Sequence, residues 1–147
     1  MTVRHIFVAA LRNAPARSVP NVEAVAGVGL EGDRYAEARN RRGPGQEVTF
    51  IELEAIREFT QKTHLAMTPA MPRRNIVTEG VRLDRLVGRR FRIGEAEFEG
   101  LEPCEPCAKF ARNTHREALK FFVHRGGLRA RIVRGGQVRV GDPLEVL

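Results

Sequence analysis

The segment GGLRARIVRGGQVRVGDPLEVL (residues 126–147) decides the fold class of this chain. It holds three short apolar runs separated by glycine turns: residues 128–133, 138–140 and 144–147, with Gly135-Gly136 and Gly141-Asp142 between them. Such dipeptides favour tight connections between strands. The strands follow one another too closely to leave room for the helices of a doubly wound α/β sheet. The segment therefore predicts a β-rich fold.

Short strand patterns continue from this segment toward the N-terminus. We predict strands over residues 3–10, 22–30 (weakly alternating), 47–51, 75–78, 90–93 and 96–101. The last two form a hairpin turned at Gly94-Glu95. Residues 39–45 (RNRRGPG) are basic and rich in turn formers, which predicts a surface loop.

Two segments predict helices. Residues 53–62 carry apolar side chains at helical spacing, and Thr114 followed three residues later by Glu117 matches a capping box at the start of a second helix. The expected buried faces are Leu53, Ala55, Ile56 and Phe59 in the first helix and Leu119, Phe122 and Val123 in the second, which ends at Gly126-Gly127. These short strands with two helices predict a mainly β fold, a twisted β-barrel with about two helices.

The composition is that of an ordinary globular domain. Of the 147 residues 42% are apolar and 29% charged, and no repeat or linker divides the sequence, so we expect one domain over residues 1–147. The apolar run of residues 6–11 is too short for a secretory signal, and no run approaches the ~20 apolar residues of a membrane span. We therefore expect a cytoplasmic protein without a membrane partner, and a monomer.

The charge balance favours an anionic ligand. The chain has 22 arginines and three lysines against 18 acidic residues, a net charge of +7. A guanidinium binds phosphate or carboxylate through two parallel hydrogen bonds, although a genome with a high arginine preference would give the same count. With eight Phe, one Tyr and no Trp, stacking platforms for single-stranded nucleic acid are scarce, so nucleic acid is an unlikely ligand.

The segment LEPCEPCAKF (residues 101–110) is the most unusual feature. A thiol acts as ligand or nucleophile in its thiolate form, and two prolines stiffen the chain beside Cys104 and Cys107. A lone CxxC is a weak motif, and three alternatives stay open. Both cysteines can be small buried hydrophobic residues, they can bind zinc together with His115 and His124, or they can form a thioredoxin-like dithiol, which needs a βαβ context.

Polar residues that could bind an anion occur in two further segments. PRRNIVTEG (residues 72–80) places Arg73, Arg74 and Asn75 at the mouth of a strand, and GLEGDRY (residues 29–35) frames Asp33 and Arg34 with glycines. The alternatives are a solvated loop for the first and a turn closed by an Asx hydrogen bond for the second. On the strand that follows Gly127, Arg129 and Arg131 face the same side. The sequence lacks GxSxG, HExxH, Walker A and GxGxxG motifs, so hydrolase, zincin and nucleotide-binding functions have no support.

Taken in order, these segments resemble the MOSC family, named after the C-terminal domain of molybdenum cofactor sulfurases. The matching segments are GLEGDRY, QEVTFIELEAI, RRNIVTEGV, LVGRRFRIGEAEFEG, EPCEPCA and GGLRARIVRGGQVRVGD, which span about residues 27–142. The resemblance implies a mostly β, barrel-like MOSC domain that binds the molybdenum cofactor (molybdopterin) or handles sulfur. It implies no pyridoxal phosphate, because the fused domain that carries it in some relatives is missing here.

The resemblance also implies roles for individual residues. Cys107 matches the family's cysteine after a proline, which ligates molybdenum in relatives that reduce N-hydroxylated compounds. Arg74 and Asn75, with Asp33, Arg73 and Arg34, are the implied cofactor contacts. Cys104 departs from the family pattern, since many relatives carry arginine near this position, and it could take part in catalysis through a persulfide or disulfide step.

The resemblance implies two possible functions that depend on Cys107, and RNA binding is a third possibility that does not. The first is an oxidoreductase that removes oxygen from a small N-oxygenated substrate at a molybdenum bound by Cys107, with a separate electron donor. The second is a sulfur carrier with a persulfide on Cys107, resolved by Cys104 and supplied by a sulfur donor protein. The third is a basic barrel that binds RNA through charge, for which salt dependence without cysteine dependence is expected.

Overall fold

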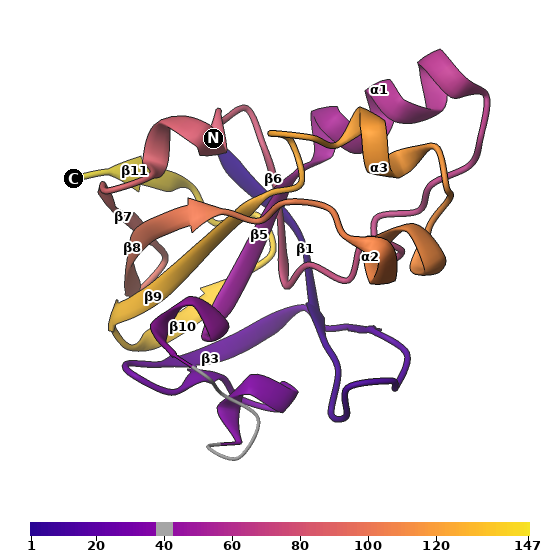
Figure 1. Ribbon diagram of the computed structural model, residues 1–147. Helices are drawn as coiled ribbons and strands as arrows, with labels where there is room; N and C mark the ends of the chain where they lie inside the picture. Colours follow the sequence, from indigo (N-terminus) through magenta and orange to yellow (C-terminus); the bar gives the residue numbers. More distant parts are fainter. Residues whose placement is uncertain (38–42) are drawn as a thin grey trace.

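The computed structural model describes residues 1–37 and 43–147, and most of its ordered elements are strands (Figure 1). An eight-stranded sheet has the order β11-β7-β8-β9-β5-β6-β1-β2, and a three-stranded sheet has the order β10-β3-β4. The strands of the larger sheet are β1 (Thr2–Val8), β2 (Arg17–Ser18), β5 (Val48–Glu52), β6 (Ile76–Glu79), β7 (Arg90–Ile93), β8 (Ala96–Pro103), β9 (Leu128–Arg134) and β11 (Leu144–Val146). Those of the smaller sheet are β3 (Asn21–Val25), β4 (Gly29–Leu30) and β10 (Gly136–Arg139). Most of the predicted loop over residues 39–45 lies outside the described residues.

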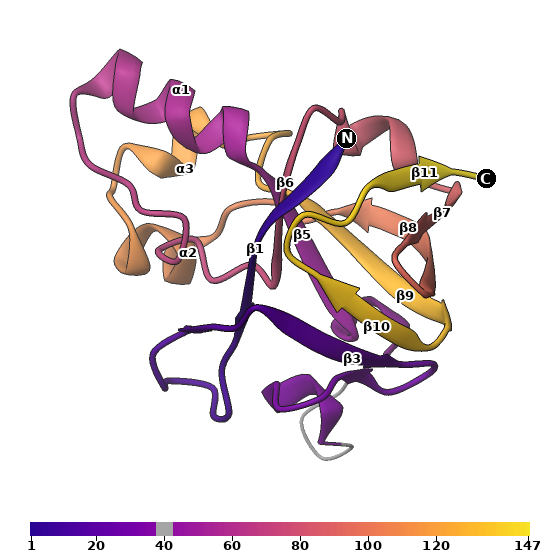
Figure 2. The same cartoon turned by 180° about the vertical axis from the view of Figure 1, so that it is seen from behind.

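The larger sheet curls back on itself, as Figures 1 and 2 show. The segment that leads into β11 is hydrogen-bonded to the start of the chain. Val3 N donates to the Asp142 carbonyl (3.0 Å), Gly141 N to the Val3 carbonyl (2.8 Å) and Leu144 N to the Met1 carbonyl (2.9 Å). One end of the strand order thus reaches β1, the strand next to the other end, and this curled sheet confirms the predicted mainly β, barrel-like fold.

Two apolar clusters fill the molecule. One lies inside the curled sheet, where the rings of Phe50, Phe91 and Phe98 pack with centroids 5.5 Å apart. The other lies between the sheet and the helices and includes Ile51, Phe59 and several further buried side chains. Because Phe50 and Ile51 point to opposite faces, β5 is covered on both sides. This fits its parallel pairing with β6, the parallel pair in a sheet whose other neighbours are antiparallel.

Helix α1 (Leu53–Thr63) makes the crossover between β5 and β6 and matches the prediction for residues 53–62. The predicted hairpin over 90–93 and 96–101 is also confirmed, as β7 and β8. Short 3-10 turns occur at Arg34–Ala36, Pro44–Gln46 and Leu83–Leu86. No helix in the described part of the chain has the length and apolar run needed to cross a membrane.

The prediction for the second helix is wrong in its start, in part of its buried face and in its end, since the last helical residue is Phe121 and not the one before Gly126. The chain forms two short helices, α2 (Ala108–Asn113) and α3 (Ala118–Phe121), and Thr114 ends the first. The Thr114 hydroxyl donates to the Phe110 carbonyl at 2.7 Å, so it satisfies a helix C-terminus instead of capping an N-terminus. Phe122 is buried as expected, but Leu119 and Val123 are 39% and 46% exposed. The predicted weak strand over residues 22–30 is likewise divided, into β3 and β4.

Candidate functional site

Cys107 lies where β8 has ended and α2 begins. It is exposed, and its backbone is extended (φ −136°, ψ −179°) as the residue preceding the first turn of α2. The backbone N–H groups of Phe110 and Lys109 face its sulfur and lower the pKa of the thiol, with a smaller contribution from the charges of Arg74 and Arg112. Partial burial opposes this effect. The arrangement therefore increases the fraction of reactive thiolate near neutral pH.

Cys104 has a different environment from Cys107. Its side chain is buried, with 1% exposure, and its N–H donates to the Gly127 carbonyl at 2.8 Å. Residues 104–107 run without a turn or bend. Three residues of extended chain span about 10 Å between Cα atoms, whereas a disulfide needs less than about 7 Å. Direct bonding between the two sulfurs therefore requires the backbone to move.

Glycine lets a neighbouring loop approach this segment closely. A Cβ atom on Gly126 would lie 2.2 Å from the Cys104 carbonyl oxygen and 3.2 Å from Pro106 Cδ. Since no side chain fits there, the Gly126-Gly127 pair fixes the path of the cysteine segment from the side of β9. The sequence suggested only a helix end at these glycines.

Arg74 joins three parts of the site. Its Nε donates to the Gly126 carbonyl at 2.8 Å and its Nη2 to the Cys104 carbonyl at 3.3 Å, while the guanidinium lies 4.9 Å from the centre of the Phe110 ring. Burial lowers the pKa of Arg74, and the charges of the two cysteine thiols act in the opposite direction. Arg74 thus holds the cysteine segment from behind and places a positive charge near both sulfurs.

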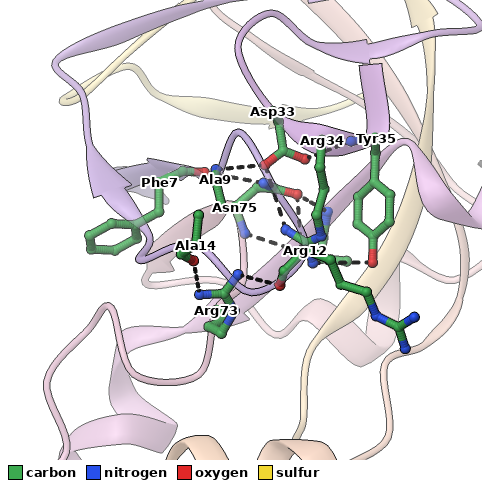
Figure 3. A network of polar contacts seen from close by, with 10 residues as sticks. Phe7, Ala9, Arg12, Ala14, Asp33, Arg34, Tyr35, Arg73 and Asn75 are labelled. Atoms are coloured by element: carbon green, nitrogen blue, oxygen red, sulfur yellow. Dashed lines mark hydrogen bonds and ion pairs between the residues drawn. The ribbon is translucent and has the colours of Figure 1, made fainter. Parts of the chain in front are cut away.

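Arg73 holds the N-terminal loop in place through hydrogen bonds to backbone carbonyls, as Arg74 holds the cysteine segment. Its backbone is left-handed (φ 58°), which turns the side chain toward residues 12–14. Nη1 donates to the Ala14 carbonyl at 2.5 Å and Nη2 to the Arg12 carbonyl at 3.0 Å (Figure 3). The loop that follows β1 is thereby fixed against the entry to β6.

Asp33 and Asn75 are buried, and their side chains bind the protein's own backbone. Asp33 accepts from Ala9 N at 2.9 Å and from Tyr35 N at 3.4 Å, and the second bond is the Asx-type turn considered above (Figure 3). Asn75 Oδ1 accepts from the N–H and hydroxyl of Thr49 at 3.1 and 3.2 Å, and its Nδ2 donates to the Phe7 carbonyl at 3.1 Å. Both residues hold the framework beneath the arginines.

Arg34 completes the group of predicted residues. Its guanidinium lies 3.8 Å from the Asp33 carboxylate and 4.3 Å from the centre of the Tyr35 ring. All five predicted cofactor contacts line one cavity of about 10 Å³, the size of a single water molecule. These residues are Asp33, Arg34, Arg73, Arg74 and Asn75. The structure thus brings together two segments that are about forty residues apart in sequence.

Further cations near Cys107 were not singled out from the sequence. Burial lowers the pKa of Lys109, and the charges of Arg12, Arg34 and Arg73 lower it further. Arg112 lies close enough to Cys107 to act on its thiol. The spacing of Lys109 and Arg112 after Cys107 could have indicated this, since residues three apart share one helix face, but the sequence placed no helix there.

Arg129 and Arg131 share the partly exposed face of β9, as predicted. Arg129 donates to the Gly45 carbonyl at 3.2 Å and its charge acts on Arg74, so it belongs to the edge of the site. Arg131 instead pairs with Glu99 at 2.8 Å.

The zinc alternative gains no support. Within residues 1–37 and 43–147 no three His, Cys, Asp or Glu side chains gather as a metal site. His115 contacts the Ala66 carbonyl at 2.5 Å and stacks on Phe59, and His124 is 85% exposed. The cysteines follow β8, which pairs antiparallel with β9, so the βαβ context of a thioredoxin-like dithiol is also missing.

A family model and a known relative each match most of this chain. The family model for the MOSC domain matches residues 37–145. The protein YiiM of Escherichia coli (strain K12) is 29% identical over 130 residues, which cover 82% of this chain and 57% of YiiM, so the chain spans little more than half of that relative.

Solved structures show the same fold at low sequence identity. The YuaD protein of Bacillus subtilis superimposes with a TM-score of 0.84 at 16% identity, covering 99% of this chain and 96% of YuaD. YiiM from Geobacillus stearothermophilus gives a TM-score of 0.79 at 16% identity, covering 99% and 74% of the two chains.

Proposed function

The chain belongs to the MOSC domain family, and we propose that it binds the molybdenum cofactor with Cys107 as the ligand that the protein provides to the metal. The family is associated with molybdenum cofactor binding. One observation carries the proposal for this chain: an exposed thiol, whose pKa is lowered, lies beside Lys109 and Arg112, whose side chains form no ion pair among the described residues. Because the chain spans only 57% of its relative YiiM, no activity of that protein is assumed for it.

The residues fit such a group. A thiolate is a soft ligand and suits a metal already bound to sulfur. The described residues offer no cluster of several ligating side chains, so the remaining ligands have to come from the cofactor itself. The cofactor carries a phosphate, which arginines bind well. A single exposed thiolate beside arginines is the pattern such a cofactor requires.

The surrounding residues have distinct tasks in this proposal. Arg34 and Arg73 add positive charge near Lys109, where the cofactor phosphate would bind, while the donors of Arg73 hold the carbonyls of Ala14 and Arg12. Arg74 is a positioning residue, because its donors bind the carbonyls of Gly126 and Cys104. Asp33 and Asn75 are also positioning residues, since their polar atoms bind the backbone.

We propose that the reaction is the reduction of a small N-oxygenated compound. Bound molybdenum supplies two-electron oxygen-atom transfer. The chain contributes a thiol held in one direction by Arg74 and Gly126, and backbone N–H groups together with nearby positive charges that lower the pKa of this thiol. The electrons come from a separate donor, because the sequence shows no flavin, haem or iron–sulfur motif.

A sulfur-carrier function is the second candidate, favoured by the exposure of Cys107. The thiolate would attack the outer sulfur of a donor persulfide, form a Cys107 persulfide and release the donor's thiol. The buried position of Cys104 and the extended chain between the two residues argue against Cys104 as the resolving thiol.

Elemental analysis tests the proposal. The protein is purified anaerobically from a host that makes molybdenum cofactor, beside Cys107→Ser and, as a matched control, Cys104→Ser. We expect near-stoichiometric molybdenum that Cys107→Ser loses and Cys104→Ser keeps. Absence of molybdenum from all three, together with a mass increase of about 32 Da (one sulfur) on Cys107, would replace cofactor binding by the sulfur-carrier function.

A further inference from the structure

Three cations form a group at Cys107: Lys109 follows it by two residues, the charge of Arg112 acts on its thiol, and the charge of Arg12 acts on Lys109. Among the described residues, the side chains of Arg12, Lys109 and Arg112 form no hydrogen bond and no ion pair. Arg12 and Arg112 are exposed and Lys109 is half-buried. We call these three residues the Cys107 rim. They differ from Arg73 and Arg74, whose donors are already bound to backbone carbonyls.

The rim is not neutralised by nearby acids. The charges that act on Lys109 are those of Arg12, Arg34, Arg73 and the Cys107 thiol. The Asp33 carboxylate is buried and accepts backbone hydrogen bonds. Glu105 is next to the cysteines in sequence, but its carboxylate accepts from His124 N at 3.1 Å, and its charge is not among those that act on the Cys107 thiol or on Lys109. The surface around Cys107 therefore carries a positive potential.

Grouped like charges cost free energy in the folded protein, and their common benefit is attraction of the opposite charge. A cation whose donors are unbound can form charge-assisted hydrogen bonds with an incoming anion without first breaking a contact of its own. The rim meets both conditions, and its members come from two parts of the chain that are remote in sequence: the loop after β1 and helix α2.

We propose that the Cys107 rim binds the anionic group of the substrate, so that the protein selects small molecules with a carboxylate, phosphate or sulfonate near the group that reacts. This inference rests on the proposed function only in taking Cys107 as the reacting centre. It adds Arg12, Lys109 and Arg112 to the site as specificity-determining residues.

Thiol labelling tests the inference without the cofactor. The rate of Cys107 labelling is measured with a dianionic aromatic disulfide, 5,5′-dithiobis(2-nitrobenzoate), and with a neutral one, 4,4′-dithiodipyridine, in cofactor-free protein with Cys104→Ala. The ratio of the two rates cancels differences in thiolate fraction and accessibility. Variants are the rim triple Arg12→Gln, Lys109→Gln, Arg112→Gln and a matched triple at exposed arginines whose charges are not among those acting on Cys107 or Lys109, Arg89→Gln, Arg134→Gln, Arg139→Gln.

We expect a ratio that rises about 10-fold when the ionic strength is lowered from 0.5 M to 10 mM, as electrostatic steering predicts. The rim triple should lose most of this rise and the matched triple should keep it. An equal rise in both triples would overturn the inference, because the net charge of the whole protein would then account for the effect.

A second arm separates a substrate anion from the cofactor phosphate. The molybdenum content of the rim triple is measured in protein purified from the cofactor-producing host. Retained molybdenum supports the substrate assignment, and its loss from the rim triple alone overturns it in favour of the cofactor. Absence of molybdenum from the wild-type protein contradicts the proposed function but leaves the labelling ratios as an independent result.

Discussion

Replacement of Arg74 by methionine tests whether this residue holds the cysteine segment in place. Methionine keeps the length and apolar packing of the side chain against Phe110 but removes the donors to the carbonyls of Gly126 and Cys104. Hydrogen bonds from a charged group contribute about 1.5–3 kcal/mol each, and the recovered desolvation of the guanidinium offsets part of the loss. We therefore expect a net destabilisation of about 2–4 kcal/mol, which corresponds to a fall of roughly 5–12 °C in Tm.

Thermal unfolding monitored by circular dichroism measures this fall. The matched control is Arg125→Met, since Arg125 also combines an acceptor, Glu58, with an aromatic ring, Phe121, but on the surface. Surface ion pairs contribute little, so the control should change Tm far less. In Arg74→Met the pH midpoint of Cys107 alkylation should also move upward. A Tm no lower than that of the control, with an unchanged midpoint, would refute the role assigned to Arg74.

Three further predictions follow from individual contacts. Gly126→Ala should lower the free energy of unfolding in urea by about 1–3 kcal/mol, because the added methyl group overpacks against the Cys104 carbonyl. Gly45→Ala is the control, and it should lower this free energy much less because its Cβ would meet only ordinary contacts of 3.6 Å and longer. Because the pKa of Cys107 lies below its ordinary value of 9.0, the rate of alkylation by iodoacetamide should reach half its plateau below pH 9.0, and a midpoint at or above that value would contradict the electrostatic account. Arg125 and Lys62 lower the pKa of Glu58 from 4.5 to about 2, so the contribution of Glu58 to stability is present above pH 4.5 and is lost as the pH falls through about 2. The difference in Tm between wild type and Glu58→Gln should therefore close as the pH falls over that range. A difference in Tm that persists at pH 2 would show that the charge of Glu58 is not its cause.

The β elements could be predicted because local alternation records which face of each strand is buried. In β8 the exposure alternates over Ala96–Leu101, and the dipeptides Gly135-Gly136 and Gly141-Asp142 mark the turns that follow β9 and β10. Helix α1 was predictable for the same reason, since its buried positions repeat at helical spacing. The capping pattern at Thr114 gave a wrong helix start because a threonine hydroxyl can bond to backbone groups at either end of a helix. Only the fold determines which end it is, and here it is the C-terminal end of α2.

The residues of the candidate site could be predicted from the sequence, but the contacts that each side chain makes could be predicted only in part. Cys107 and the arginines after Pro72 stood out by chemistry, and the structure brings them together. Asp33 and Asn75 stood out for the same reason, but their partners are backbone groups of segments remote in sequence, such as Phe7 for Asn75, about 68 residues away. The Cys107 rim was not predicted, because Arg12 is remote from Cys107 in the sequence and the fold of β1 brings it to the site.

The central claim is that Cys107 is the protein's ligand to molybdenum, and X-ray absorption at the molybdenum K-edge tests it most directly. Fine structure is recorded for the cofactor-loaded wild type, for Cys107→Ser reconstituted with cofactor in excess, and for Cys104→Ser. We predict one sulfur neighbour fewer around molybdenum in Cys107→Ser, replaced by an oxygen neighbour, and an unchanged shell in Cys104→Ser. The same number of sulfur neighbours in wild type and Cys107→Ser would contradict the claim.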